Sequence, residues 1–510
     1  MKTRRKGGRS RPVTTEIPRA HSYRQLRHPF APQSIFSQDG IARIHEMALR
    51  VVQELGIKIL LPEARAIFET AGALVDEDTQ MVRIGSDLIE RALATTPRSY
   101  RLHARSASRT QMFEDGAMLF APGAGCPNVS DLERGRRAGS LSTYEETIKL
   151  QQSFDVMHVF GPSAEPQDIP AHLRHYDMMR VQMECGDKPN FVYARGRAQV
   201  EQCFDMLRLG MDISDQNFDE NIWCYTVINT NSPRQIDVPM AEGILDFARA
   251  NQLSIITPFC LAGAMAPITI SGALVLQHAE CLAAITLAQL ARPGAPVAYG
   301  GFSSNVDMKS GSPAFGTPEH IKLSIGSGQL ARHIGLPWRS ATGAASNTND
   351  MQAAQETNMA LWAQLQANAT LTVHSAGWLE GGLTFGYEKF INDIEALQTI
   401  AELCRETPED EESLGWSALS DVDPGGHFFA TQHTMDRYKD AFYQPLVADL
   451  KNYGAWHDAG ALSSAERATK IWQETLRDFV APSDSGDVKD RLAPYIERKT
   501  QAGGAAPSGG

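Results

Sequence analysis

The spacing of hydrophobic residues predicts helices in the first part of the chain. Between residues 38 and 55 the apolar positions recur at helical spacing and lie on one stripe, and Gly56 follows where such a helix would end. Further helical segments are expected near residues 62–71 and 86–94, ahead of short strand candidates between 100 and 113. The chain therefore opens with a helical region rather than with the first strand of a large sheet.

After residue 113 the pattern becomes regular and predicts eight strand–helix units. The strands are expected at residues 117–125, 156–163, 190–195, 222–230, 253–260, 296–303, 337–344 and 369–377. The helices are expected to begin near Ser142, Pro170, Arg197, Pro239, Ile270, Thr317, Met351 and Glu388. Short apolar strands that alternate with amphipathic helices favour a parallel sheet, and eight units match a closed barrel, which typically needs ~250 residues. An open doubly wound sheet is the alternative, but the G-x-G-x-x-A stretch GSGQLA (326–331) lies inside a predicted helix.

The predicted fold class is α/β, a (β/α)8 TIM barrel with an N-terminal helical cap and a C-terminal helical extension. A hydrophobic content of 42% in 510 residues is ample for a large core. The expected segments are a disordered basic arm (1–29), the N-terminal helical cap region (30–113), the barrel (114–408), the C-terminal helical extension (409–482) and a flexible tail (483–510).

Charge and cysteine content narrow the function classes. The net charge of −12, with no basic cluster visible outside MKTRRKGGRSRP (1–12), argues against a nucleic-acid partner. The seven cysteines are scattered without a C-x-x-C pair, which argues against a zinc knuckle or a disulfide framework and for a cytoplasmic location. The basic stretch lacks the apolar segment of a secretory signal. The apolar region 253–291 is interrupted by prolines, His278 and Glu280, so a buried strand and helix are expected there rather than a membrane span.

The barrel interpretation locates the candidate site, because the active centre of such a fold lies at the carboxyl ends of the strands. The expected loops there are rich in glycine and aromatic residues, above all HSAGWLEGGLTFGYE (374–388). Each candidate also has a structural interpretation. Trp338 can be core packing, His374 a hydrogen-bonded core histidine, Glu380 a solvated carboxylate, and Asp350 a partner of a helix dipole.

Five stretches together resemble the trimethylamine methyltransferase family, whose members are corrinoid-dependent methyltransferases built on a (β/α)8 barrel. The stretches are IARIHEMALRVVQELGI (41–57), DLERGRRAGS (131–140), NDMQAAQETNMAL (349–361), AGWLEGGLTFGYEKF (376–390) and DPGGHFFATQHT (423–434). The resemblance covers roughly residues 30 to 480. It implies that the opening helices form a cap that covers the barrel or helps to build an oligomer interface.

The resemblance also implies the reaction and its partners. The family transfers a methyl group from a methylamine to the cobalt(I) of a separate corrinoid protein, and this chain has no Asp-x-His-x-x-Gly corrinoid motif of its own. We therefore expect a corrinoid carried by a partner protein, no bound metal, a homo-oligomer, and no nucleic-acid or membrane partner. Trimethylamine-specific members carry pyrrolysine, whereas this chain has only standard residues. It is similar to the branch that acts on quaternary amines such as glycine betaine, with the pyrrolysine position expected near Ser346 or Asn347.

The expected mechanism is an SN2 displacement in which the protein positions a quaternary ammonium that has no N–H to donate. Phe302, Trp338, Trp378, Phe385 and Tyr387 are candidate aromatic walls, Asp350 and Glu380 are candidate counter-charges, and Arg195, Arg339 or His374 can bind a substrate carboxylate. His374 and Glu380 are also expected to position the reactants. The alternatives are a zinc-dependent or other methyltransferase, a barrel lyase that uses His374 and Glu380 as acid and base, and a non-catalytic binder of quaternary amines.

Overall fold

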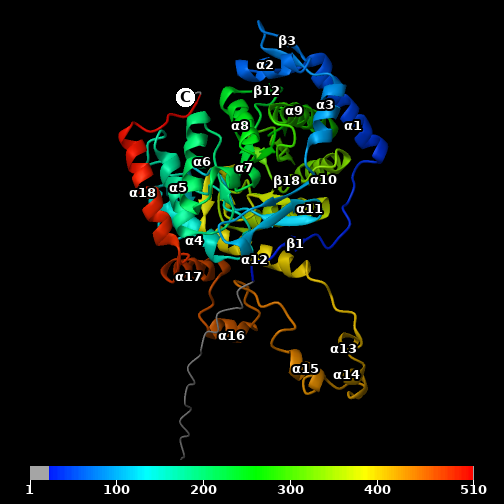
Figure 1. The fold of residues 1–510 in the computed structure, drawn as a ribbon. Helices are drawn as coiled ribbons and strands as arrows, with labels where there is room; N and C mark the ends of the chain where they lie inside the picture. The colour runs from blue at the N-terminus through cyan, green and yellow to red at the C-terminus, as the bar shows by residue number, and fades with distance from the viewer. Residues whose placement is uncertain (1–21, 509–510) are drawn as a thin grey trace, which may run out of the picture.

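The computed structural model describes residues 22–508, and its centre is a parallel sheet surrounded by helices (Figure 1). The strands are hydrogen-bonded in the order β7–β19–β18–β15–β13–β11–β10. Their bounds are β7 (Ala117–Phe120), β10 (Asn190–Phe191), β11 (Cys224–Ile228), β13 (Leu253–Ile256), β15 (Val297–Gly300), β18 (Trp338–Ala341) and β19 (Leu371–Val373). All of their residues except Val227 are buried, as expected for parallel strands covered on both faces. Seven of the eight predicted strands are thus present, each shorter than predicted.

Residues 156–163 do not form the predicted regular strand, although the segment lies between β7 and β10. The backbone N–H of His158 donates to the carbonyl of Phe120, and that of Phe160 donates to Pro189, both at 3.0 Å. A regular ladder does not form because Nδ1 of His158 accepts the Phe120 N–H at 3.0 Å in place of a backbone carbonyl. Pro189 also has no N–H to give.

The eight predicted helices are all present and follow the predicted order. They are α4 (Leu141–Ser153), α5 (Arg174–Cys185), α6 (Arg197–Met211), α8 (Val238–Arg249), α9 (Ile270–Ala291), α10 (Pro318–His333), α11 (Met351–Ala367) and α12 (Tyr387–Leu403). Seven begin within one residue of the predicted position. Helix α5 begins four residues late, because the chain from Pro170 to Leu173 forms a turn first. A short extra helix, α7 (Asp215–Glu220), lies between α6 and β11.

The N-terminal region packs on α9, the most apolar helix of the chain. Its elements are α1 (Gln38–Arg50), a π-helical turn (Val51–Leu55), β2 (Ile57–Ile59), α2 (Pro62–Thr70), β3 (Leu74–Asp76), β4 (Met81–Arg83) and α3 (Ser86–Thr95). Within the described residues, α9 is the one helix long and apolar enough to cross a membrane, and 78% of its apolar stretch is buried inside the protein. The prediction of a buried strand followed by a buried helix at 253–291 is therefore confirmed by β13 and α9.

A hairpin closes one end of the sheet interior. Strands β5 (Ser99–Leu102) and β6 (Gln111–Glu114) pair antiparallel, with a 3-10 turn at Ala107–Arg109 between them. Tyr100 and Phe113 from the hairpin join one buried cluster with inward-facing side chains of the strands, among them Leu119, Leu253 and Leu371. Leu253 and Leu371 are the first residues of β13 and β19, so the hairpin covers the amino ends of these strands and leaves the carboxyl ends for the loops.

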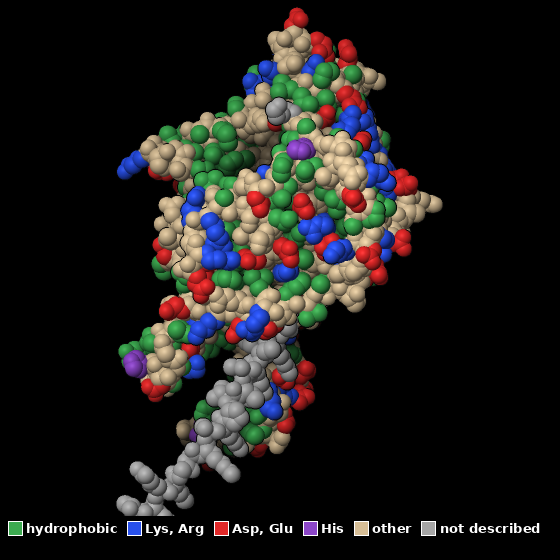
Figure 2. Space-filling model, turned by 90° about the vertical axis from the view of Figure 1, so that its left-hand side faces the viewer, with side chains coloured by type: hydrophobic (Ala, Val, Ile, Leu, Met, Phe, Trp, Pro, Cys, Tyr) green, Lys and Arg blue, Asp and Glu red, His purple; other side chains and the backbone are tan. Residues whose placement is uncertain are grey.

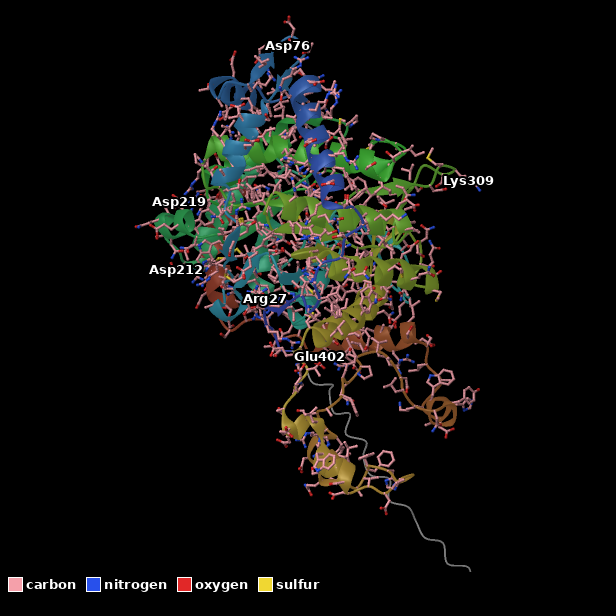
Figure 3. The ribbon with its side chains drawn as sticks, turned by 90° about the vertical axis from the view of Figure 1, so that its right-hand side faces the viewer. Arg27, Asp76, Asp212, Asp219, Lys309 and Glu402 are labelled. Carbon is pink, nitrogen blue, oxygen red and sulfur yellow. The ribbon has the colours of Figure 1, made fainter. Side chains whose placement is uncertain are left out.

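Small sheets build the loops at the carboxyl ends. They contain β8 (Asn128–Ser130), β9 (Arg137–Ala138), β12 (Gln235–Ile236), β14 (Leu261–Ala262), β16 (Ser304–Val306), β17 (Pro313–Ala314), β20 (Trp378–Leu379) and β21 (Thr384–Gly386), with a 3-10 turn at Glu380–Gly382. The β16–β17 hairpin projects from the body, with Lys309 near its tip (Figure 3). Figure 2 shows hydrophobic side chains gathered around a hollow beneath a projecting segment.

Both chain ends depart from the predicted arm and tail. Strand β1 (Leu26–Arg27) pairs antiparallel with β7, so part of the predicted 1–29 arm is ordered, and residues 1–21 lie outside the described part. Helix α18 (Ser485–Gln501) occupies the predicted tail and buries Val488, Leu492 and Tyr495 against α5 and α6. The apolar residues of α18 recur at helical spacing, and their burial outweighs the cost of Pro494 inside the helix. The predicted C-terminal extension contains α13 (Glu411–Leu414), α14 (Trp416–Ser420), α15 (Gln432–Arg437), α16 (Tyr453–Asp458) and α17 (Ser464–Arg477).

Candidate active site

A cavity of about 360 Å³ lies at the carboxyl ends of the strands. It is lined by Ala124, Gly125, Pro127, Gly161, Pro162, Phe191, Tyr193, Tyr225, Val227, Asn229, Phe259, Phe302, Arg339, Val373, His374, Trp378, Gly381, Gly382 and Leu383. Six aromatic rings dominate this surface besides His374, Arg339 is its one charged side chain, and no carboxylate lines it. Such a cavity suits a small molecule that combines an apolar or cationic part with an anionic part.

The alternation of side chains along the strands explains much of the lining. In β11 and the residue after it, Tyr225, Val227 and Asn229 point to the cavity, while the residues between them face the helices. Phe191 and Tyr193 repeat this pattern at β10. The sequence analysis missed these residues. The side chains in NFVYAR (190–195) and CYTVIN (224–229) alternate between the two faces of the strand. Once one residue of such a strand is known to face the cavity, this alternation identifies the others.

Phe302, His374 and Trp378 form the aromatic core of the cavity wall. The rings of His374 and Trp378 are stacked, with centroids 4.4 Å apart and 17° between their planes. The Phe302 ring lies 5.0 Å from that of His374 and 5.7 Å from that of Trp378, and the Phe259 ring stacks on Phe302 at 4.9 Å. His374 has a left-handed backbone, with φ at 58°, directly after β19. Strained backbone of this kind gathers at functional sites, and here it turns the imidazole into the cavity beside Val373.

Arg339 carries a buried positive charge that no acidic side chain among the described residues neutralises. Its Nε and Nη1 have no hydrogen-bond partner among the described residues, and only 2% of the residue is exposed. The guanidinium carbon lies 5.0 Å from the centre of the Phe302 ring. Burial lowers the pKa of Arg339 to about 9, so the group is still charged at neutral pH. An unpaired buried charge is costly, and a bound anion would supply the missing partner.

His374 adds a second donor at the same point. Its Nδ1 accepts the backbone N–H of Ala124 at 3.2 Å, so the neutral ring carries its proton on Nε2. Burial, with Arg339 beside it, holds the pKa of His374 well below its ordinary value, so the neutral form is the relevant one. Nε2 then lies 3.4 Å from Nη2 of Arg339 with a proton on each nitrogen. Two donors that face each other need an acceptor between or beside them, and a carboxylate oxygen supplies one.

Trp378 is both a cavity wall and a packing element. Three glycines make room for its indole: a β-carbon would lie 3.2 Å from the ring at Gly123, 1.9 Å at Gly343 and 2.5 Å at Gly382. Its Nε1 is buried without a partner among the described residues. Trp378 therefore lines the cavity and is closely packed against its neighbours, while its role in recognition stays a prediction.

Four of the ten predicted site residues line the cavity, namely Phe302, Arg339, His374 and Trp378. Trp338 does not, because it precedes Arg339 in β18 and points to the other face, where Nε1 donates to the Asn368 carbonyl at 2.8 Å. Phe385 is fully buried behind the cavity wall.

Asp350, Arg195 and Glu380 also lie outside the lining. Asp350 caps helix α11 by accepting backbone N–H groups of its first turn. Arg195 pairs with Glu165 and lies 4.0 Å from the centre of the Tyr193 ring. Glu380 accepts from Arg136 at 2.9 Å, and although partial burial opposes ionisation, this contact lowers its pKa. Glu380 therefore holds the Gly381–Gly382 turn against the β8–β9 hairpin rather than meeting a substrate.

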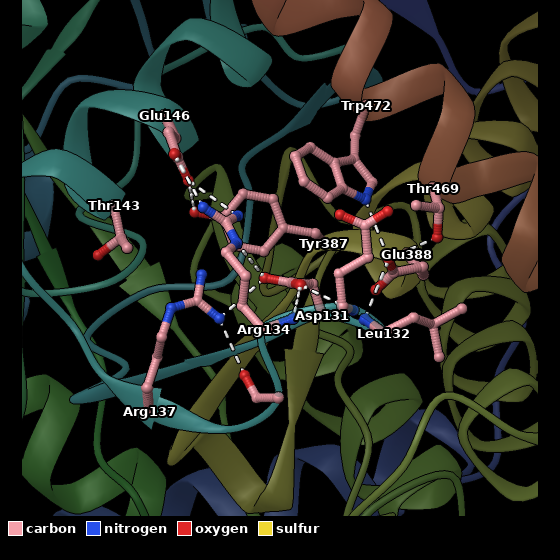
Figure 4. Close-up of polar contacts among 12 residues, drawn as sticks. Asp131, Leu132, Arg134, Arg137, Thr143, Glu146, Tyr387, Glu388, Thr469 and Trp472 are labelled. Carbon is pink, nitrogen blue, oxygen red and sulfur yellow. Dashed lines mark hydrogen bonds and ion pairs between the residues drawn. The ribbon is translucent and has the colours of Figure 1, made fainter.

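Tyr387 belongs to a polar cluster outside the cavity (Figure 4). Its hydroxyl donates to Glu146, and the guanidinium carbon of Arg134 lies 5.0 Å from its ring centre. Arg134 also pairs with Asp131 at 2.8 Å. Much of the DLERGRRAGS stretch (131–140) thus joins the loop after β8 to α4 and α12.

No cluster for a metal ion is present in the part of the chain between residues 22 and 508. No group of three or more His, Cys, Asp or Glu side chains there is arranged to hold one. The expectation of no bound metal stays a prediction.

Comparison with known proteins identifies the family. The family model described as trimethylamine methyltransferase (MTTB) matches residues 4–504, nearly the whole chain. A glycine betaine methyltransferase of Desulfitobacterium hafniense (strain Y51) is 32% identical over 471 residues, covering 91% of this chain and 97% of that relative. The chain belongs to the trimethylamine methyltransferase family.

Other members and one solved structure extend this comparison. The family's trimethylamine methyltransferase MttB1 of Methanosarcina mazei is 27% identical over 498 residues, covering 92% of this chain and 96% of that protein. The crystal structure of the Methanosarcina barkeri monomethylamine methyltransferase aligns over 87% of this chain and 93% of that one, at 10% identity and a TM-score of 0.46. Its low similarity score adds nothing to the family assignment.

Proposed function

We propose that this protein transfers a methyl group from a betaine, a quaternary ammonium that also carries a carboxylate, to the cobalt of a corrinoid held by a separate protein. The observation that carries this proposal is one cavity that combines aromatic walls with the unpaired guanidinium of Arg339. The relative named glycine betaine methyltransferase supports the same substrate class. The proposed substrate-binding residues are Phe302, Arg339, His374 and Trp378, joined by Tyr193 and Tyr225.

The aromatic rings bind the quaternary ammonium. Such a nitrogen has no N–H, so it gains from ring faces rather than from hydrogen-bond acceptors, at ~0.5–2 kcal/mol for each well-placed ring. The absence of a carboxylate from the lining leaves the substrate's own carboxylate as the counter-charge. This arrangement favours a zwitterion over a simple cation, which Arg339 repels.

Arg339 and His374 bind the carboxylate end. A carboxylate oxygen beside Nη2 of Arg339 and Nε2 of His374 satisfies both donors, and the free Nε and Nη1 of Arg339 can donate to the second oxygen. Hydrogen bonds between charged groups in a buried site are worth ~1.5–3 kcal/mol each. Holding one end of the substrate fixes the direction in which the N-methyl groups point, and orientation is the main contribution a protein can make to a displacement.

The corrinoid fits the mouth of the cavity, not its interior. A corrin ring is much larger than a 360 Å³ cavity, and the described residues offer no histidine or cysteine cluster for a metal. A reduced corrinoid supplies a cobalt(I) nucleophile that accepts a methyl group. The departing amine is neutral and needs no proton, so His374 is a positioning residue and not an acid. Phe302 and Trp378, both nearly fully buried, exclude water from the reacting groups.

Exposed apolar side chains on the loops at the carboxyl ends of the strands form a contact surface for the corrinoid protein. Leu132, Ile268, Met308 and Leu383 are each more than half exposed, and they follow β8, β13, β15 and β19. Leu383 also lines the cavity. Exposed apolar groups around a cavity mouth are typical of a protein–protein contact.

The remaining proposals concern fold and location. The backbone N–H groups of His158 and Phe160 bond to Phe120 of β7 and to Pro189 beside β10, which supports a closed (β/α)8 barrel in which this segment lies between β7 and β10. The barrel would span residues 114–408, with the helical cap at 30–113. Free cysteines throughout the described chain support a reducing, cytoplasmic location, and a homo-oligomer is expected.

The test is methyl transfer to free cob(I)alamin, followed by its absorption spectrum. Glycine betaine, choline and trimethylamine are compared, because choline keeps the quaternary ammonium and lacks the carboxylate. We expect methylcobalamin to form with a betaine at a rate far above that with choline or trimethylamine. Equal rates with betaine and choline, or transfer from trimethylamine alone, would refute the proposal.

A further inference from the structure

A buried ion pair lies directly behind the loop that carries the aromatic wall of the cavity. Lys389 and Asp393 lie one turn apart in α12, and their charged groups are in contact. Lys389 is 1% exposed and Asp393 is 5% exposed, so both charges are removed from water. Neither residue lines the cavity, so substrate binding as proposed above uses neither of them.

The ion pair is connected to one backbone amide of the cavity wall. Oδ2 of Asp393 accepts the N–H of Gly377 at 2.9 Å, in a buried hydrogen bond. Nζ of Lys389 also donates to the hydroxyl of Thr357 in α11 at 2.9 Å, and so it is fixed from a second helix. Thr357, Gly377 and Lys389 belong to two of the stretches that resemble the family, 349–361 and 376–390. These two stretches therefore meet at the ion pair.

The backbone around Gly377 is held by three hydrogen bonds. Besides the N–H of Gly377, which donates to Asp393, the carbonyl of Ala376 accepts the N–H of Gly123 at 2.8 Å. The carbonyl of Gly377 accepts the N–H of Gly386 at 2.9 Å. Gly377 has φ at 83°, in the left-handed region that favours glycine. Of the three hydrogen bonds, the one to Asp393 involves a side chain, so a substitution can remove it and leave the others in place.

This amide lies between the two stacked rings of the wall. His374 precedes Gly377 by three residues, Trp378 follows it directly, and the two rings stack with centroids 4.4 Å apart. The backbone at His374 is held separately, because its carbonyl accepts from the Thr342 hydroxyl at 2.8 Å. A rotation of the peptide group that contains the Gly377 N–H therefore acts mainly on the residue that follows, and it moves the Trp378 indole relative to the imidazole.

Stability alone does not account for a charged pair at this place. Replacing a buried ion pair by apolar residues of similar volume often leaves a protein equally stable or more stable. Burial raises the pKa of Asp393, and the contact with Lys389 opposes that rise. A charged acceptor, however, forms a shorter and stronger hydrogen bond with an amide than a neutral acceptor does. A charge at this position is thus favoured by a need to orient the Gly377 amide.

We propose that Asp393, held by Lys389 and Thr357, is a positioning residue that sets the direction of the Trp378 ring through the Gly377 amide. The ring in turn sets the direction in which the substrate presents its N-methyl group. This inference rests on the proposed function, because the direction of the ring affects methyl transfer only if Trp378 contacts the substrate. A displacement of ~1 Å at a reacting centre can cost ~100-fold in rate, so the effect is expected on kcat and not only on affinity.

Two double variants separate the hydrogen bond from the charges. Both carry Lys389→Met. The acceptor-retaining double variant adds Asp393→Asn, which keeps an oxygen for the Gly377 N–H, and the acceptor-lacking double variant adds Asp393→Leu, which removes it. Neither contains the ion pair, so a difference between them reports on the acceptor. Urea unfolding shows that both are folded, and Asp393→Ala replaces Asp393→Leu if the latter prevents folding.

A third variant controls for the general effect of removing a carboxylate from α12. Glu395 lies two residues after Asp393 and accepts the backbone N–H groups of Val447 and Ala448, which do not line the cavity. Glu395→Leu therefore removes a similar contact at a place from which the Trp378 ring is not directed. We expect it to lower the urea midpoint and to leave kcat unchanged.

The kinetic test measures methyl transfer to cob(I)alamin at saturating betaine. We expect kcat to fall ~100-fold in the acceptor-lacking double variant and to stay within ~10-fold of the wild type in the acceptor-retaining one. Equal kcat values in the two double variants would overturn the proposal. A loss of kcat in Glu395→Leu as large as that in the acceptor-lacking double variant would overturn it as well.

Fluorine NMR of protein labelled with 5-fluorotryptophan observes the Trp378 ring without any substrate. Trp378→Phe assigns its resonance among those of the seven tryptophans. We expect that resonance to shift in the acceptor-lacking double variant and to stay in place in the acceptor-retaining one and in Glu395→Leu. An unshifted resonance in the acceptor-lacking double variant would overturn the proposal. If the wild type transfers no methyl group from a betaine, the proposed function fails, while the shift still supports Asp393 as the residue that positions Trp378.

Discussion

Replacement of Arg339 by methionine separates substrate recognition from stability. The side chain is nearly fully buried, its charge is unpaired, and methionine replaces its aliphatic stem without the guanidinium. If Arg339 binds a carboxylate, the variant leaves that carboxylate buried without its partner. Loss of one member of a buried charge pair costs ~2–5 kcal/mol, which is roughly a 30-fold to several-thousand-fold weaker affinity.

The same change should leave the protein at least as stable. In the free protein Arg339 bears the cost of burying a charge and gains only the contact of its guanidinium with the Phe302 ring. Removing the charge therefore keeps or raises the free energy of unfolding. Choline is the internal control, because it retains the quaternary ammonium and meets one fewer positive charge in the variant, so its affinity should stay the same or increase.

Calorimetric titration of betaine and choline, with urea unfolding of both proteins, measures all three quantities. The reasoning predicts lost betaine binding, retained choline binding and undiminished stability. A variant that binds betaine as well as the wild type does, or one that loses stability and both ligands together, would show that Arg339 is a structural residue.

Four further outcomes follow from the same geometry. Trp378→Ala should lower the free energy of unfolding by ~3–5 kcal/mol and weaken the binding of both betaine and choline, measured by urea unfolding and calorimetry; a loss of only one of the two would contradict its double role. Gly343→Ala should displace the indole, since the new β-carbon would lie 1.9 Å from it, and so weaken betaine binding; unchanged binding would refute the packing argument. Trp338→Phe should cost ~1–3 kcal/mol of stability through its lost indole hydrogen bond and leave the betaine affinity unchanged, whereas altered affinity would return Trp338 to the site. Burial lowers the pKa of His158 to about 3 and that of His320 to about 4. Below the unfolded value of ~6.5 the unfolded chain therefore binds protons that the folded chain does not, so the free energy of unfolding should fall by up to ~2 kcal/mol for each histidine between pH 7 and 5. Urea midpoints that do not change over that range would contradict this.

The fold was largely predictable because its signals are local. Apolar runs of strand length alternate with helical patterns, and caps such as Thr317 and Asp350 mark where helices begin. The segment at 156–163 has the apolar composition of a strand, but the side chain of His158 takes a ladder hydrogen bond, and the sequence does not reveal that contact. Helix α18 was missed because a polar, proline-containing stretch looks like a tail until α5 and α6 offer a surface for Val488 and Leu492.

The site was predictable in part, for a reason visible in β18. Trp338 and Arg339 are neighbours in one strand, and successive side chains of a strand point to opposite faces, so only one of the two can line the cavity. Applying the alternation rule to β11 would have found Tyr225 and Asn229. Phe385 and Tyr387 share the long loop with Trp378 and are buried in the same cluster, yet neither of them lines the cavity. Chain neighbourhood within a loop does not determine direction, which depends on pairing between distant segments.

The structure of the protein with a bound betaine tests the central claim most directly. The account predicts the carboxylate against Nε, Nη1 or Nη2 of Arg339 and Nε2 of His374. It predicts the trimethylammonium among the rings of the cavity, with one N-methyl group directed to the mouth beside Leu383. A betaine bound in the opposite direction, with its ammonium beside Arg339 or its carboxylate toward solvent, would contradict it.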